Sequence, residues 1–244
     1  MEAFVSVLVL GFVLGLRHAT DADHVVAVGA ITSRERSLRS ALLIGVSWGL
    51  GHALTVLVVG GGIVLFGLVI PPRVGLGMEF SVALMLIVLG VVNLQGAVRR
   101  LHEVAHDVRA QALSGDGSAA PPITSRATAV VRAALPVGAL RAVGVGIVHG
   151  LAGSAAVALL VLASITNARF ALLYLAVFGL GTILGMVTLT SALALPVAYA
   201  AERFQSVHRG IGRVAGFLSV ALGLFLAYRI GFVDGLFTSS AITP

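Results

Sequence analysis

The sequence predicts an all-α integral membrane protein with about six transmembrane helices, arranged as two three-helix inverted repeats. Three observations support this fold class: the composition, the spacing of apolar segments and the similarity of the two halves. Of the 244 residues, 58% are hydrophobic and 11% are charged, and the mean hydropathy is +1.06. Soluble domains carry about 25% charged residues, and crossing a bilayer takes about 20 consecutive apolar residues. This composition therefore excludes an ordinary soluble domain.

The chain divides into apolar segments separated by polar loops. The segments cover residues 3–31, 40–70, 79–98, 137–165, 169–200 and 211–231. A polar run from Arg17 to His24 interrupts the first segment, and Phe4–Leu16 alone is too short to span a bilayer. We therefore expect this run to lie inside the membrane or to break the helix there. The second and fifth segments exceed one span, so we expect bends or ends near Gly60–Gly62 and Pro196.

The arginines predict the orientation in the membrane. All 16 cationic residues are arginines, and only Arg73, Arg169 and Arg229 fall on one side of the predicted bilayer. The other side receives Arg34, Arg36, Arg39, Arg99, Arg100, Arg109, Arg126, Arg132, Arg141, Arg203, Arg209 and Arg213. Cytoplasmic loops carry the arginine excess, so we expect a multi-pass protein of the cytoplasmic (inner) membrane with both termini outside. The high pI of about 11.2 then reflects topology in a lipid bilayer, and we expect no nucleic-acid partner.

The two halves of the chain resemble each other at a nearly constant offset of about 130 residues. The aligned pairs are Gly15–His18 with Gly146–His149, Trp48–His52 with Phe178–Thr182, and Leu89–Val91 with Leu222–Leu224. Three helices per half is an odd number, so the halves must insert with opposite orientations. Inverted repeats of this kind are common in secondary transporters. We predict a first repeat over 1–98, a cytoplasmic linker over 99–136 and a second repeat over 137–244.

The interrupted first segment gathers ionisable side chains where they are costly. On an ideal helix with 3.6 residues per turn, His18, Asp21 and His24 fall within roughly a 120° arc. Asp23 then points away, unless the helix unwinds, and Arg17 is the expected internal counter-charge. Nitrogen and oxygen donors without sulfur suit Ni(II), Co(II), Zn(II) or Cu(II), and the chain has no cysteine. The alternative is a buried ion-pair network that only fixes helix packing.

Two further histidines lie in apolar segments. His52 is in the second segment, where a single histidine often only hydrogen-bonds across helices. His149 is the repeat counterpart of His18, which favours a role in the same pathway. Ser154 and Thr182 are polar residues expected to support a route through the membrane.

These motifs carry a resemblance to a known family. Arg17–Val25 resembles the H-x4-D-H signature of the nickel/cobalt transporter (NiCoT) family, and Trp48–Thr55 is similar to that family's second motif. His149–Ala156 resembles the short branch that includes urease-accessory nickel permeases. The acidic second-half motifs of larger members are not found here. The resemblance implies a metal site formed by His18, Asp21, Asp23, His24, His52 and His149.

We therefore expect secondary-active uptake of Ni²⁺ or Co²⁺, with the ion as cargo, no prosthetic group and a link to a nickel-enzyme maturation system. The alternatives are efflux by the same kind of permease, an intramembrane metalloenzyme, or an accessory metal-binding subunit. An intramembrane enzyme is disfavoured because only one tight pair of histidines lies in an apolar segment, while the H-E-x-x-H pattern at His102–His106 falls in the predicted cytoplasmic linker. The absence of lysine excludes a P-loop ATPase. The oligomeric state is not indicated by the sequence.

Overall fold

The computed structural model describes residues 2–33, 37–114, 137–152, 162, 164–203 and 205–238. Within these ranges the chain is helical and contains no strand, which confirms the predicted all-α class. The helices are α1 (Glu2–His18), α2 (Ala22–Thr32), α3 (Leu38–Phe66), α4 (Pro72–Ser114), α6 (Val137–Leu151), α8 (Ala168–Arg203) and α9 (Gln205–Tyr228), followed by the π-helical turn η2 (Arg229–Val233).

The helices are long and apolar enough for a multi-pass membrane protein. Four spans meet the length and hydropathy expected of a crossing: Leu38–Phe66, Pro72–Gln95, Ala168–Val197 and Gly210–Val233. A fifth forms if α1 and α2, bent by 52° at their junction, cross together. The predicted fourth segment, 137–165, is described as a helix only as far as Leu151, and this part is shorter than one span.

The helix of the first segment breaks inside the polar motif. This was one of the two arrangements expected from the sequence. α1 ends at His18, and the Thr20 and Asp21 amides donate to the Arg17 and His18 carbonyls at 2.8 and 3.1 Å. α2 then begins, with the Val25 amide donating to the Asp21 carbonyl at 3.0 Å. These bonds satisfy the backbone groups that a helix break leaves open. Irregular backbone at membrane depth is tolerated where protein buries it.

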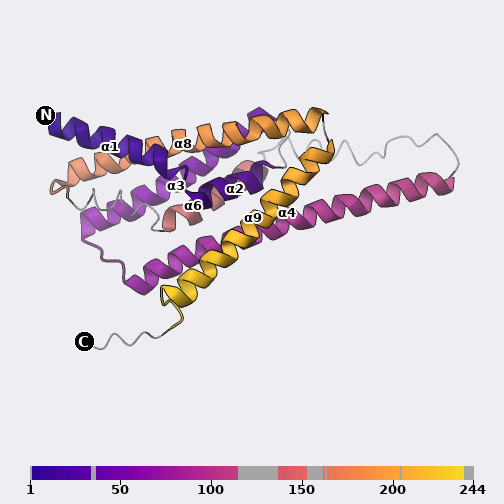
Figure 1. Cartoon of the computed structure of the whole chain (residues 1–244). Coiled ribbons are helices and arrows are strands. Elements are labelled where there is room, and N and C mark those ends of the chain that lie inside the picture. The colour runs from indigo at the N-terminus through magenta and orange to yellow at the C-terminus, as the bar shows by residue number, and fades with distance from the viewer. Residues whose placement is uncertain are drawn as a thin grey trace.

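The helices pack as two groups with short helices between them. Figure 1 shows α1, α8 and α3 on one side, α4 crossing α9 on the other, and α2 and α6 in the middle. The main contacts pair α1 with α8, α6 with α3, α3 with α8, and α4 with α9. α1 begins and η2 ends at the same end of the bundle (Figure 1). The most fully buried side chains include Trp48, Tyr174 and Phe178.

Gly15 and Gly146 allow very close helix approaches near the motif. A Cβ placed on Gly15 would lie 2.9 Å from the Thr182 backbone nitrogen and closer still to the Phe178 carbonyl oxygen. A Cβ on Gly146 would lie 2.9 Å from the His52 backbone nitrogen and closer still to the Trp48 carbonyl oxygen. Any side chain at these two positions would push α1 from α8, or α6 from α3. Small residues permit such backbone contacts between membrane helices.

The helix ends differ in places from the sequence expectations. α3 continues through Gly60–Gly62, since Gly60 and Gly61 pack against leucine side chains of α8. It ends at Phe66 and is followed by Gly67, whose φ of 62° is left-handed. α8 likewise continues past Pro196 to Arg203. α4 extends beyond residue 98 into the predicted linker as far as Ser114, whereas residues 115–136 lie outside the described part of the chain.

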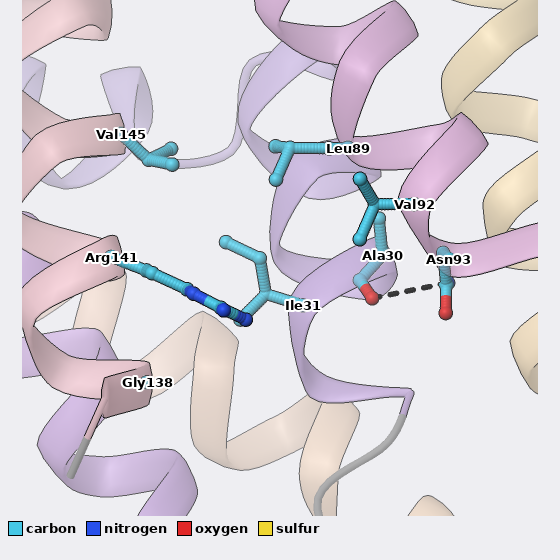
Figure 2. Close-up of a pocket in the computed structure, with 8 residues that line it drawn as sticks. All are labelled: Ala30, Ile31, Leu89, Val92, Asn93, Gly138, Arg141 and Val145. Carbon is cyan, nitrogen blue, oxygen red and sulfur yellow. Dashed lines mark hydrogen bonds between the residues drawn. The ribbon is translucent and has the colours of Figure 1, made fainter. Parts of the chain in front are cut away.

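One buried side chain fixes the far end of α2. The Asn93 amide nitrogen of α4 lies 3.1 Å from the Ala30 carbonyl oxygen, 3.0 Å from Ser33 Oγ and 3.1 Å from the Gly212 carbonyl oxygen of α9. Figure 2 shows the bond from Asn93 to Ala30 beside a cavity between α2, α4 and α6. Because α2 is short, this junction holds it in position and therefore orients the residues at its other end.

Candidate metal centre

Four histidines from four helices meet in the interior of the bundle. His18 ends α1, His24 lies in the first turns of α2, His52 is in the middle of α3, and His149 is near the end of α6. All four are buried, with exposed fractions of 5% or less. Asp23 joins them from the first turn of α2 and is mostly buried. The helix break and the close helix approaches at Gly15 and Gly146 thus bring together residues far apart in sequence.

The first group of potential ligands is purely nitrogenous. One ring nitrogen from each of His18, His24 and His52 lies within 4.8 Å of the others. The Nε2 atoms of His18 and His52 are 3.2 Å apart, and the ring centroids of His18 and His24 are 4.7 Å apart. Three converging imidazoles can bind a divalent transition ion when they are neutral.

The second group adds a carboxylate and shares one histidine with the first. Asp23 Oδ1 lies 3.1 Å from His24 Nδ1, and Asp23 Oδ2 lies 3.3 Å from His149 Nε2. One ligand atom from each of the three residues lies within 4.8 Å of the others. The rings of His24 and His149 are 4.4 Å apart between centroids. His24 therefore stands between two overlapping sets of donors, one of three nitrogens and one of two nitrogens and an oxygen.

Hydrogen bonding prepares several nitrogens to bind a cation. His18 Nδ1 lies 2.9 Å from Asp21 Oδ2, so its Nδ1–H donates to the carboxylate and its Nε2 presents a lone pair towards His52. Among the described residues, His24 Nε2, His52 Nδ1 and His149 Nδ1 are buried without a hydrogen-bond partner. Buried polar atoms of this kind are rare in native structures, and the binding of an ion is one of their recognised explanations.

The helix break rearranges the two aspartates relative to the ideal-helix expectation. A continuous helix would group Asp21 with His18 and His24 and turn Asp23 away. Instead, Asp21 precedes the first residue of α2, and its side chain is 41% exposed and bonded to His18. Asp23 points inwards, where its two oxygens face His24 and His149. This arrangement corresponds to the alternative in which Asp23 joins the site when the helix unwinds.

The three supporting residues predicted from the sequence have different placements. Arg17 is exposed and forms none of the ion pairs found among the described residues, because the last turn of α1 directs it outwards. Thr182 is buried, but its hydroxyl donates to the Phe178 carbonyl of its own helix at 3.0 Å. Ser154 lies outside the described residues.

The sequence reasoning did not single out an aromatic wall beside the histidines. Trp48 is fully buried and stacks on His24 with a centroid distance of 6.0 Å and an interplanar angle of 13°. Its ring centroid is also 5.3 Å from that of His149, while the Phe178 centroid lies 5.7 Å from that of His18. Trp48 is the only tryptophan in the chain and lies one helical turn before His52, which was the available signal.

Comparison with known proteins places the chain in a family. No protein-family model matches the sequence, and no solved structure matches the chain. A curated relative, the urease accessory protein UreH of Bacillus sp. (strain TB-90), is 34% identical over 232 residues, which cover 95% of each chain. The match spans both halves of the chain. At this identity and coverage, the chain belongs to the family of the urease accessory protein UreH.

Proposed function

We propose that the protein carries a divalent transition-metal ion, Ni²⁺ or Co²⁺, across the cytoplasmic membrane towards the cytoplasm as a secondary transporter. The observation that carries this proposal is the convergence of four buried histidines and Asp23 from both halves of the chain. Ionisable residues inside a membrane protein are costly, and they typically mark ion pathways. Family membership adds support, since the relative is named an accessory protein of urease. The NiCoT resemblance links such proteins to the supply of a nickel enzyme.

The donor chemistry favours Ni²⁺ and Co²⁺ over harder and softer ions. Imidazole nitrogens suit Ni, Co, Zn and Cu(II), whereas all-oxygen sites suit Mg²⁺, Ca²⁺ and Mn²⁺. Here four imidazoles accompany a single inward carboxylate, and the chain has no thiolate for Cu(I). The ion is the cargo, so affinity must permit release. The two overlapping donor sets that share His24 offer successive positions for one ion.

The glycine contacts support the proposed inverted repeat. Gly15 lies against the backbone of Phe178 and Thr182 in the way that Gly146 lies against Trp48 and His52, and these are the residues that the repeat alignment pairs. A second couple follows the same rule: a Cβ on Gly90 would lie 2.8 Å from the Val220 nitrogen, and one on Gly223 would lie 2.9 Å from the Ile87 nitrogen. Reciprocal contacts of this kind are expected around a pseudo-two-fold axis.

The same symmetry supports the proposed layout of six crossings with both termini outside. α1, α3 and α4 would form the first repeat (1–98), and α6, α8 and α9 the second (137–244), joined by the cytoplasmic linker 99–136. α1 begins at the end of the bundle where η2 finishes, as an even number of crossings requires (Figure 1). The arginine excess then places that common end outside the cell.

Flux through the purified protein tests the proposal. Proteoliposomes containing only this chain should take up Ni²⁺ and Co²⁺, with weaker flux of Zn²⁺ and Mn²⁺, and an imposed pH gradient should change the rate if protons are exchanged. The His18→Ala variant should lose this flux, while His102→Ala in the α4 extension serves as a histidine control. Equal flux in the wild type and in His18→Ala would contradict the proposed site.

Two outcomes distinguish the neighbouring hypotheses. Lower metal content in cells that express the wild-type protein would indicate efflux rather than uptake. Flux that requires a second protein in the liposomes would indicate an accessory subunit.

A further inference from the structure

A cavity of about 270 Å³ lies beside the histidine cluster and contains an acidic residue that no motif identified. Its wall includes Asp23 and Ala22 from the start of α2, Glu79 and Val82 from α4, and Leu226 from α9. Asp23 therefore borders both spaces: its oxygens face His24 and His149 inside the bundle, while the same residue lines the cavity. The cavity is thus contiguous with the candidate metal centre.

Glu79 is out of place for a purely structural residue. It lies within the apolar span Pro72–Gln95, where a carboxylate costs free energy. No hydrogen bond or ion pair of Glu79 is found within the described part of the chain, although Arg229 and Asp234 are near enough to influence its charge. A charged group inside a membrane span is by default a functional candidate, and this one faces a cavity that ends at Asp23.

The size of the cavity fits an ion that still carries water. One water occupies about 30 Å³ in the liquid, so 270 Å³ accommodates a cation with several waters. Lining by two carboxylates and apolar side chains concentrates cations, because low-dielectric walls focus the field of the acids. Divalent metal ions are hydrated in solution, and exchange of those waters for imidazole has to occur next to such a space.

The cavity at the other end of α2 is lined by a basic residue instead of acidic ones. A smaller cavity of about 140 Å³ lies between α2, α4 and α6 beside Ala30 and Ile31, and its charged residue is Arg141. Figure 2 shows Arg141 extending from α6 towards Ile31. An arginine there disfavours the accumulation of cations. Along α2, therefore, the acidic cavity is the one suited to capturing a cation.

We propose that the cavity lined by Asp23 and Glu79 is the outer vestibule of the transport pathway, in which Glu79 captures hydrated divalent cations and passes them to Asp23 and the histidines. This inference rests on the proposed function and on the proposed orientation. Glu79 acts before the ion is bound by imidazole, so it governs how well dilute metal is captured and leaves the maximal rate nearly unchanged.

Uptake kinetics test the role of Glu79. Initial rates of Ni²⁺ uptake over a range of concentrations should show a roughly fivefold higher KM for Glu79→Gln, with Vmax within about twofold of wild type. Glu79→Asp should restore most of the affinity, because it keeps the charge. The matched control is Glu2→Gln, an exposed carboxylate at the same end of the bundle and outside the cavity. An unchanged KM in Glu79→Gln, or a fall in Vmax alone, would overturn the proposal.

Thiol labelling tests the vestibule without relying on transport. The chain has no cysteine, so Leu226→Cys places a single thiol on the cavity wall. A membrane-impermeant cationic thiol reagent added outside intact cells should modify it, and Ni²⁺ should slow the reaction. Leu224→Cys, on the exposed surface of the same span, is the lipid-facing control and should not react.

The two measurements separate the failure of this inference from that of the proposed function. If wild-type protein moves no metal but Leu226→Cys is labelled from outside and protected by Ni²⁺, the vestibule stands and the transport proposal fails. If wild type transports Ni²⁺ but Leu226→Cys is unreactive from outside, or is modified equally with and without Ni²⁺, the vestibule is wrong.

Discussion

Two helix junctions in this molecule have the same backbone geometry and different chemistry. Where α1 meets α8, Gly15 packs against the backbone of Phe178 and Thr182. Where α6 meets α3, Gly146 packs against Trp48 and His52 at the corresponding positions. In the first junction the threonine hydroxyl bonds its own helix, whereas in the second the histidine faces His18 across 3.2 Å.

Close helix packing is therefore separable in this fold from the placement of candidate metal ligands. Both junctions need glycine, because a backbone lies where a Cβ would be. At the α6–α3 junction, the longer helix α3 contributes the imidazole of His52, whereas α8 contributes none at the α1–α8 junction. The pair Asp23 and His24, which follows the break between α1 and α2, belongs to the first half. The candidate site is therefore asymmetric, and among the described residues His18 and His149 are its one pair at corresponding positions of the two similar halves.

The strongest way to break the asymmetric site is to remove its shared histidine. His24→Ala deletes a donor from both ligand groups. Loss of groups that merely orient ligands costs about 10- to 100-fold in metal affinity, so we expect a loss beyond 100-fold and background Ni²⁺ uptake. Uptake in cells, normalised to protein abundance, checks this, with His102→Ala as the control. Retained uptake at normal affinity in His24→Ala would remove His24 from the site.

The next largest effect should fall equally on the two junctions. Gly15→Ala and Gly146→Ala each force a methyl group against a backbone carbonyl, and overpacking of this kind costs about 1–3 kcal/mol or more. We expect similar falls in Tm for the two detergent-purified variants. Gly144→Ala is the matched control, since nothing lies within 4 Å of a Cβ there. A large loss in one variant and none in the other would contradict the symmetric packing.

Substitution of His52 and Thr182, which occupy corresponding positions at the two junctions, should separate metal binding from helix packing. His52→Thr removes a donor of the first group and should weaken Ni²⁺ binding by at least about 10-fold, since loss of a group that only orients a ligand already costs that much. Thr182→Val removes a hydroxyl that bonds only the Phe178 carbonyl and should leave Ni²⁺ binding within about twofold. Isothermal titration of purified protein measures both. Equal losses in the two variants would show that the junctions contribute alike.

A small effect should come from replacing Trp48 by another aromatic residue. Trp48→Phe keeps a ring beside His24 and removes an indole N–H that is buried without a partner in the described structure. We therefore expect a change in uptake KM of about threefold or less, whereas Trp48→Ala leaves a cavity worth about 3–5 kcal/mol and should destabilise the protein. A Trp48→Phe variant as inactive as His24→Ala would assign the indole a direct role.

Local spacing allowed much of this site to be predicted. His18 and His24 lie in one short motif, and their membrane setting follows from the apolar residues on either side. The conformation within the motif was not predictable from spacing, because an ideal helix turns Asp23 away, whereas the break at Ala19–Asp21 turns it inwards. The position of His52 beside His18 depends on how α1 and α3 each pack against α8, which the spacing of residues along the sequence does not indicate.

The sequence could also have indicated Glu79, whose charge opens an apolar segment, but its meaning depends on the cavity that joins it to Asp23. Arg17 shows the reverse case. Its proximity in sequence suggested a counter-charge, but the end of α1 at His18 directs it outwards. Short-range patterns thus predicted which residues could donate to a metal ion, and the helix break decides which charged side chains face the candidate site.

The central claim is that histidines from both halves of the chain bind a single metal ion. Ni²⁺ titration of the purified wild-type, His18→Ala and His149→Ala proteins tests it most directly. We predict one ion per wild-type chain and a weaker affinity for that same ion in both variants. Full wild-type affinity in His149→Ala, alongside loss in His18→Ala, would confine the site to the first half and contradict the account.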